Sequence, residues 1–143
     1  MGRILALDYG TKRTGIAVSD PLRIIANSLD TVPTASLRDY LRKYFAGNDV
    51  DIIVVGKPTQ MDGTPSQTFA AAESLAASLR AEFPGKEVAS FDERFTSVLA
   101  QRAMIEGGVK KMGRRDKGLV DRVSATIILQ GYMEWLQNKR EQI

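Results

Sequence analysis

Acidic side chains stand at three points of the sequence where chemistry could be assembled. Asp8 ends an apolar run, the pair Asp92 and Glu93 ends another, and Asp121 stands near the start of the last amphipathic stretch. Carboxylates that converge without matched basic partners repel one another at neutral pH unless a divalent cation lies between them. Hard oxygen ligands favour Mg²⁺ or Mn²⁺, so the pattern predicts a site for one or two such ions.

The composition narrows the chemistry of such a site. The chain has no cysteine and no histidine, which excludes disulfides, thiol nucleophiles, Cys/His zinc sites and imidazole-based triads. Two divalent cations about 3.5–4 Å apart can activate water and stabilise the leaving oxygen of an in-line displacement, which suits phosphodiester cleavage without imidazole. The net charge of +3 weakly favours a polyanionic partner.

Each acid also has an ordinary structural role. Asp8 could cap the glycine turn that follows it. Asp92 and Glu93 could form a charge cluster at a strand end, and strand alternation lets only one of them share a face with the site. Asp121 could simply suit the dipole in the first turn of a helix. The occurrence of all of these acids in one chain favours a shared site.

The strands of the fold must position these acids. Runs of β-prone residues occur in five segments: 3–8, 14–19, 24–32, 51–56 and 86–91. The first three predict an antiparallel meander, whereas the β-branched run 51–56 predicts a central strand buried on both faces, with helices on both sides. Strands one, four and five are joined by helical crossovers and should run parallel. Asp8, Gly56 and the 92–93 pair then meet at one edge of the sheet, where α/β proteins place their sites.

Helical periodicity completes the expected architecture. It is predicted over 34–47, 66–83 and 119–139, and Thr96 or Ser97 can cap a further helix. The order β-β-β-α-β-α-β-α-α predicts an α/β fold in three layers, α/β/α, with a mixed five-stranded sheet. On the last helix Asp121 shares a stripe with Ser124, Ala125, Ile128 and Tyr132, so it should face inward.

Basic residues lie close to these acids in the sequence. Lys12, Arg13 and Arg94 are predicted to position phosphates. The segment 107–118 carries four glycines and five basic residues, which predicts a mobile loop beside Asp121. Its candidate phosphate contacts are Lys110, Lys111, Arg114 and Arg115, although a merely solvated loop would look the same.

Three aromatic residues are interpreted as structural. Tyr9 and Phe95 could stack on bases, but packing is the preferred interpretation for both. Trp135 is expected in the core or at an interface.

Four stretches of the sequence, in order and with compatible spacing, carry a resemblance to a known family. LALDYGTKRTGIAVSDP, GKPTQMDGT, FDERFTS and DRVSATIILQGYM resemble successive motifs of the YqgF family, the Holliday junction resolvase-like proteins assigned to pre-16S rRNA processing. The resemblance spans nearly the whole chain and implies a ribonuclease H-like fold. The acidic positions of the family map by motif onto Asp8, Glu93 and Asp121, and this mapping selects Glu93 over Asp92. Lys57-Pro58-Thr59 departs from a more apolar Gly-Leu-Pro-Leu type run, which bears on loop contacts and not on the acids.

The expected function follows from the acids and the resemblance together. We expect a Mg²⁺- or Mn²⁺-dependent nuclease, with 5′-end maturation of pre-16S rRNA as the activity that the resemblance implies. The alternatives are a resolvase of branched DNA and a non-catalytic protein that binds nucleic acid or assembling ribosomes. The turn Asp8-Tyr9-Gly10-Thr11 also resembles the phosphate-binding hairpin of actin-like and sugar-kinase ATPases, but those enzymes need two such domains.

The remaining expectations concern organisation and location. Residues 1–143 are expected to form a single domain. The sequence has no apolar run long enough for a membrane span, so a cytoplasmic protein is expected. The expected partners are nucleic acid, with pre-rRNA preferred and branched DNA as the alternative, and the ribosome or its precursors. The expected assembly is a monomer or a weak homodimer.

Overall fold

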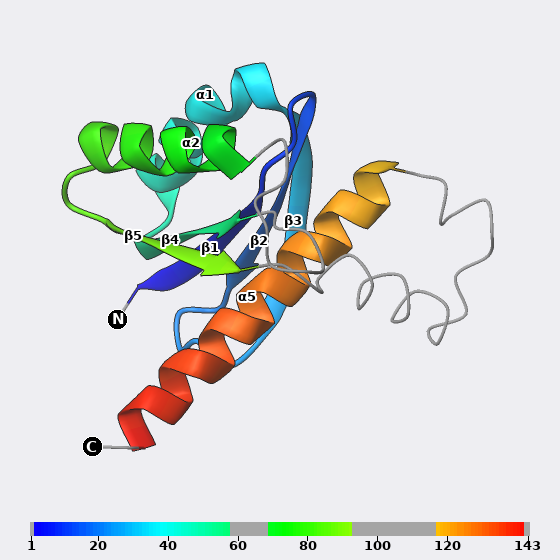
Figure 1. The fold of residues 1–143 in the computed structure, drawn as a ribbon. Coiled ribbons are helices and arrows are strands. Elements are labelled where there is room, and N and C mark those ends of the chain that lie inside the picture. Colours follow the sequence, from blue (N-terminus) through cyan, green and yellow to red (C-terminus); the bar gives the residue numbers. More distant parts are fainter. Residues whose placement is uncertain (1, 58–68, 93–116, 142–143) are drawn as a thin grey trace.

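The computed structural model describes residues 2–57, 69–92 and 117–141, and within these ranges the side chains of 92, 117–122, 138, 140 and 141 are not described. Three strands come first, and helices and strands then follow in turn (Figure 1). The elements are β1 (Arg3–Asp8), β2 (Arg13–Ser19), β3 (Ala26–Pro33), the short 3₁₀ helix η1 (Thr34–Ser36), α1 (Leu37–Gly47), β4 (Val50–Lys57), α2 (Phe69–Glu82), β5 (Glu87–Asp92) and α5 (Lys117–Glu141).

The five strands form one mixed sheet in the order β3-β2-β1-β4-β5. The meander β1-β2-β3 is antiparallel, whereas β4 pairs in parallel with both β1 and β5. The expected parallel arrangement of strands one, four and five is therefore confirmed, and β4 lies between the other two. The carboxyl ends of these three strands consequently share one edge of the sheet.

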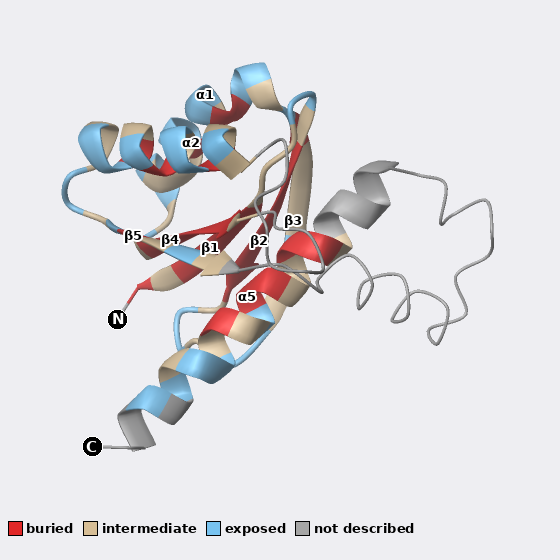
Figure 2. Ribbon diagram, in the orientation of Figure 1, coloured by how far each residue is buried: buried red, intermediate tan, exposed pale blue. Residues whose placement is uncertain are grey.

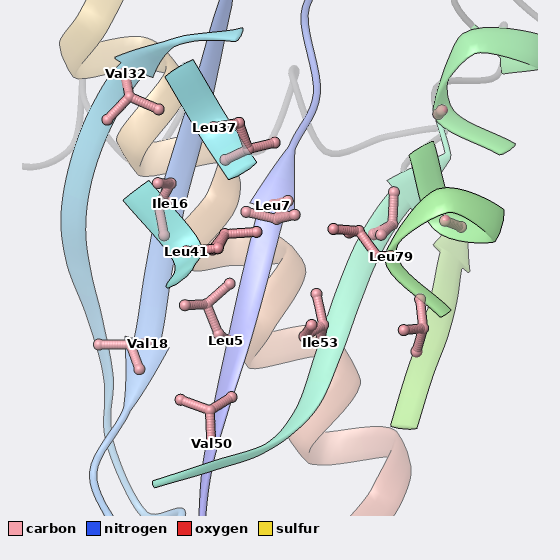
Figure 3. Close-up of a cluster of buried hydrophobic side chains, with 14 residues drawn as sticks. Leu5, Leu7, Ile16, Val18, Val32, Leu37, Leu41, Val50, Ile53 and Leu79 are labelled. Atoms are coloured by element: carbon pink, nitrogen blue, oxygen red, sulfur yellow. The ribbon is translucent and has the colours of Figure 1, made fainter. Parts of the chain in front are cut away.

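Strand alternation divides the apolar side chains between two cores. On β1, Leu5 and Leu7 belong to the core beneath α1 and α2, whereas Ile4 and Ala6 belong to the core beneath α5. Figure 3 shows the first core, with Leu7, Leu41 and Leu79 converging from the strands and the two helices. In Figure 2 the strands are mostly buried, because helices cover the sheet on both faces. The three-layer α/β/α architecture is thereby confirmed.

The long helix α5 covers the second face by itself. Its predicted inward stripe is confirmed at the four positions after Asp121, since Ala125 and Ile128 are fully buried and Ser124 and Tyr132 are only 4% and 5% exposed. Gly131 makes a close approach to β5 possible, because a Cβ at this position would lie 2.6 Å from Cζ of Phe91. No helix in the described part of the chain is both long and apolar enough to cross a membrane.

The third strand begins later than predicted. It starts at Ala26, and the carboxylate of Asp20 explains why. This carboxylate accepts hydrogen bonds from the backbone N–H groups of Leu22, Ile24 and Ile25 at 3.2, 2.7 and 2.8 Å. The segment 20–25 is thus folded into a turn, because the two amides that an earlier strand would use are bound to Asp20.

Other expectations also differ from the structure. The first turn of the segment 34–47 is the 3₁₀ helix η1. The last helix starts at Lys117, so residues 117–118 belong to a helix and not to the predicted loop, and Asp121 lies beyond the first turn. A single glycine costs a helix only about 1 kcal/mol, which the packing of a long helix readily offsets. Trp135 is 51% exposed and therefore not a core residue.

Candidate functional site

The carboxyl ends of three parallel strands form the edge at which the candidate site lies. Asp8 is the last residue of β1, and Asp92 is the last residue of β5. Leu7 pairs with Val55, so the next residues of the two strands, Asp8 and Gly56, lie at the same height in the sheet. Lys57 pairs with Asp92 one residue further on. Glu93 follows Asp92 directly and lies outside the described residues.

Asp8 projects from the α5 face of the sheet, because it continues the alternation of Ile4 and Ala6. It is half-buried, and it pairs with Gly15 on β2. Gly56 on β4 occupies the same level on the other side, and both glycines are buried. Neither neighbouring strand therefore places a side chain beside the carboxylate of Asp8. At this level the side chain of Asp8 is therefore the one that β2, β1 and β4 place on the α5 face.

The alternation of β5 distinguishes the two acids at its end. Ala89 and Phe91 pack in the core beneath α5, so the next register position, Asp92, belongs to the face of α1 and α2. Asp92 is thus at the edge but not on the face of Asp8. Sequence alternation alone left the choice between Asp92 and Glu93 open.

The helix α5 reaches the same edge. It starts on the side of the sheet where β1, β4 and β5 end and runs back towards the side where β1 begins (Figure 1). Asp121 stands three and four residues before Ser124 and Ala125, which are buried against the sheet. Its backbone position is therefore at the edge, on the inward stripe of the helix. The side chain of Asp121 is not described, and its role stays a prediction.

The hairpin tip between β1 and β2 presents the nearest basic residues. Lys12 is exposed and Arg13 is half-buried, a few residues after Asp8. Gly10 is required in this turn, because a Cβ would lie 2.5 Å from the backbone oxygen of Arg13. The other candidate phosphate contacts, Arg94, Lys110, Lys111, Arg114 and Arg115, lie outside the described residues.

Two threonines hold the hairpin tip in place, and the sequence analysis missed them. Thr34 Oγ1 donates to the backbone oxygen of Gly10 at 2.6 Å, and its backbone N–H donates to the backbone oxygen of Lys12 at 2.9 Å. The Oγ1 atoms of Thr14 and Thr34 lie 2.9 Å apart, and Thr14 is fully buried. The sequence signal for this contact is the hydroxyl of Thr14 in an otherwise apolar strand, because a buried hydroxyl needs a hydrogen-bond partner.

Lys57, the first residue of the departure from the family pattern, points to the other face of the sheet. Its Nζ lies 3.0 Å from Oε1 of Glu73 on α2 and 5.4 Å from the centre of the Phe69 ring. This ion pair connects the end of β4 to α2. It leaves the face of Asp8 without a basic side chain from β4.

The donor set at the edge fits a hard divalent cation, because the predicted ligands are carboxylates beside two glycines. Among the described residues no group of three or more metal-ligating side chains occurs. Of the three predicted ligands, only the side chain of Asp8 belongs to the described residues. The ligand assignment of Glu93 and Asp121 therefore stays a prediction.

A larger groove lies at the opposite edge of the sheet. It has a volume of about 750 Å³ and lies between the segment 22–26 and the second half of α5. Its walls include Ile24, Ile25, Met133 and Leu136 but none of the predicted ligands. Volume alone is therefore a poor guide to the site in this protein.

Comparison with known proteins gives a consistent result. A protein from Azobacteroides pseudotrichonymphae is 53% identical over 96% of this chain and 99% of its own length, and one from Parabacteroides distasonis is 52% identical over 94% and 96%. Both carry the provisional name pre-16S rRNA nuclease. The structure of Thermus thermophilus RuvC in complex with a Holliday junction substrate has a TM-score of 0.51 and 17% identity, covering 94% of this chain and 97% of that one.

The RuvC likeness confirms the ribonuclease H-like fold, and the names of the relatives indicate a nuclease. The model of the family RuvX, described as Holliday junction resolvase, matches residues 2–135. The motifs quoted above for the YqgF resemblance lie within this range, so the resemblance is confirmed. The chain therefore belongs to the RuvX (YqgF) family.

Proposed function

We propose that this protein is a divalent-metal-dependent nuclease that cleaves phosphodiester bonds in pre-16S rRNA. The observation that carries the proposal is the position of Asp8. This carboxylate stands at the carboxyl edge of the sheet, between Gly15 and Gly56, on the face covered by a helix that carries a second acid. A carboxylate at this edge, together with a second acid on the covering helix, fits a shared metal site better than an isolated structural aspartate does.

Asp8, Glu93 and Asp121 would hold the metal. The register of β5 supports Glu93, since the position before it belongs to the other face of the sheet. One or two ions of Mg²⁺ or Mn²⁺ in this place supply the charge that activates water and stabilises the leaving oxygen. Carboxylate ligands of opposite charge to the cation also explain how several acids can stay ionised close together.

The hairpin tip would hold the substrate backbone. Lys12 and Arg13 follow Asp8 closely, and the hydrogen bonds of Thr34 fix the turn that carries them. Charged groups on a fixed turn lose little conformational entropy when they bind phosphates. These contacts would position the strand without reading its sequence.

RNA is the preferred substrate because the curated relatives are named for pre-16S rRNA. Branched DNA is the second candidate, favoured by the description of the family model as Holliday junction resolvase. A non-catalytic binding protein is a weaker candidate, since binding alone gives no reason for acids at a place where phosphates approach.

Cleavage assays with matched substrates test the proposal. A fragment of pre-16S rRNA, an unstructured RNA of equal length and a four-way DNA junction are each incubated with Mg²⁺, Mn²⁺ or chelator. We expect metal-dependent cleavage of the rRNA fragment by the wild type and none by Asp8→Asn. Preferential cleavage of the junction would favour the resolvase, whereas no cleavage of any substrate with either metal would refute the nuclease.

A further inference from the structure

A small pocket lies at the same edge of the sheet as Asp8 but on the other face. It has a volume of about 290 Å³ and lies between the hairpin tip and the first turns of α1 and α2. Tyr9 and Thr34 line it from the hairpin side, Arg38 from α1, and Ser74 and Leu75 from α2. None of its described lining residues is acidic.

Tyr9 connects this pocket to the site. It follows Asp8 directly in the chain and packs against the core beneath α1 and α2, whereas Asp8 projects from the α5 face. Two consecutive residues, with Cα atoms about 3.8 Å apart, thus place their side chains on opposite faces of the sheet at the same edge. A ligand that crosses the edge at this point can contact both.

The walls of the pocket are suited to a flat, partly polar group. Leu37 and Leu75 supply apolar surface, and the Tyr9 ring, half-buried, supplies an aromatic one. The volume is at the lower end of the range of about 300–1,000 Å³ that is usual for small-molecule pockets. It is therefore large enough for a single aromatic base and too small for a helix or a second protein chain.

The frame of the pocket is fixed by contacts outside it. Thr34 is held by its hydrogen bonds to Gly10 and Thr14, which set the distance between η1 and the hairpin. Arg38 on the rim donates from Nη2 to Ser78 Oγ on α2. Its Nε also lies 4.0 Å from Oε2 of Glu82, so the charge that favours an anionic ligand at this edge is that of Lys12 on the exposed turn.

We propose that this pocket takes one unpaired base of the nucleic-acid strand whose phosphate lies beside Asp8, with the base stacked on Tyr9. The proposal rests on the proposed function and deepens it. A strand that crosses the edge of the sheet would turn its phosphate towards Asp8 and its base towards Tyr9. Because a paired base cannot enter the pocket, the nucleotide at the cleavage point must be single-stranded or turned out of its helix.

Photo-crosslinking identifies the base directly. Unstructured RNAs with 5-iodouridine at one position at a time are irradiated with the wild type in chelator, so that binding is observed without cleavage. We expect one position to crosslink to Tyr9. Removing the base at that position should weaken binding to the wild type about tenfold, within the roughly 5- to 150-fold that stacking of one base is worth.

Three variants separate stacking from folding. Tyr9→Leu should bind RNA about tenfold more weakly and should be indifferent to removal of the base, whereas Tyr9→Phe, which retains a ring, should behave as the wild type. Ser74 is exposed on α2, and Ser74→Leu should block the pocket without disturbing the core. Ser74→Leu should therefore weaken RNA binding as Tyr9→Leu does, and it tests the pocket even if Tyr9→Leu folds poorly.

Two outcomes would overturn the inference. One is crosslinking away from Tyr9 at every position, and the other is unchanged RNA binding by both Tyr9→Leu and Ser74→Leu. Either result leaves the nuclease proposal standing if the wild type still cleaves with metal. Failure of cleavage with intact crosslinking to Tyr9 would refute the nuclease and retain the base pocket.

Discussion

Asp8 on β1 lies directly opposite Gly15 on β2, at the last pair of their antiparallel ladder. Because paired residues of a ladder project from the same face, the carboxylate has a bare backbone as its neighbour. Gly56 on β4 likewise has no side chain at this level. Neither neighbouring strand therefore has a Cβ at the level of this acid.

A side chain added at Gly15 should impair the reaction before it impairs folding. Gly15→Ala places a methyl group beside Asp8, and we expect kcat to fall at least tenfold, since a displacement of about 1 Å can cost about a hundredfold. RNA affinity in chelator should stay near the wild-type value. Gly47→Ala is the matched control, because no atom lies within 4 Å of its added Cβ. Wild-type kcat for Gly15→Ala would show that the glycine beside Asp8 has no function in the reaction.

Removing one ligand charge should abolish hydrolysis while preserving shape. Asp8→Asn is expected to lose turnover and retain its melting temperature and much of its RNA affinity, as measured by cleavage, circular dichroism and filter binding. Glu93→Gln and Asp121→Asn should behave alike. Double variants should lose little more than the single ones if the acids act as a unit. Losses that add in the double variants would argue against one shared site.

Metal should stabilise the folded protein. The acids repel one another in the metal-free state, and an ion that binds only the native state adds about 2.7 kcal/mol at a hundred times its Kd. Scanning calorimetry in millimolar Mg²⁺ or Mn²⁺ should show a higher melting temperature than in chelator. The shift should shrink in Asp8→Asn. An equal shift in both proteins would place the binding ion elsewhere.

The basic residues of the segment 107–118 should govern binding and its salt dependence. Replacing Lys110, Lys111, Arg114 and Arg115 by Ala should weaken RNA binding and flatten its dependence on salt concentration, because fewer counterions are released. The effect of metal on the melting temperature should stay near wild type. Unchanged binding at both low and physiological salt would show that the charges only face solvent. A large loss of thermal stability would show that the segment is packed.

Tyr132 should make the protein sensitive to alkaline pH. Burial, reinforced by Glu87 and opposed by Arg23, raises the pKa of its phenol above the ordinary value near 10. The folded state thus prefers the neutral phenol, so the stability linked to Tyr132 is complete below pH about 10 and is lost as pH rises through the higher pKa of the folded state. Urea unfolding of Tyr132→Phe should show a shallower alkaline loss. Parallel curves for the two proteins would contradict this assignment.

The sequence predicts the centre of this fold better than its connections. The bounds of β1 follow from an apolar run that Asp8 ends, and the inward stripe of α5 follows from small and apolar residues at helical spacing. The start of β3 could not be predicted, because it depends on the carboxylate of Asp20 binding amides up to five residues away. Local propensity carries no information about which amides a distant side chain binds.

For the candidate site, the sequence predicts the edge and the face but not the supporting contacts. Alternation alone placed Asp8 correctly, while the bare neighbour Gly15 depends on the register of the hairpin. The support of the turn by Thr34 joins residues 24 positions apart, and no sequence period marks such a pair. Glu93 and the side chain of Asp121 lie outside the described residues, so their part of the site stays a prediction.

The turn at residues 20–25 gives the protein a second response to salt. Asp20 holds this turn by hydrogen bonds while Leu22, Ile24 and Ile25 stay 67%, 69% and 58% exposed, at the edge of the sheet opposite to Asp8. Added salt screens contacts with phosphates, but sulfate and phosphate salts also strengthen the attraction between apolar surfaces. Chloride titrations will therefore report on nucleic-acid binding, whereas ammonium sulfate will drive these turns together and salt the protein out.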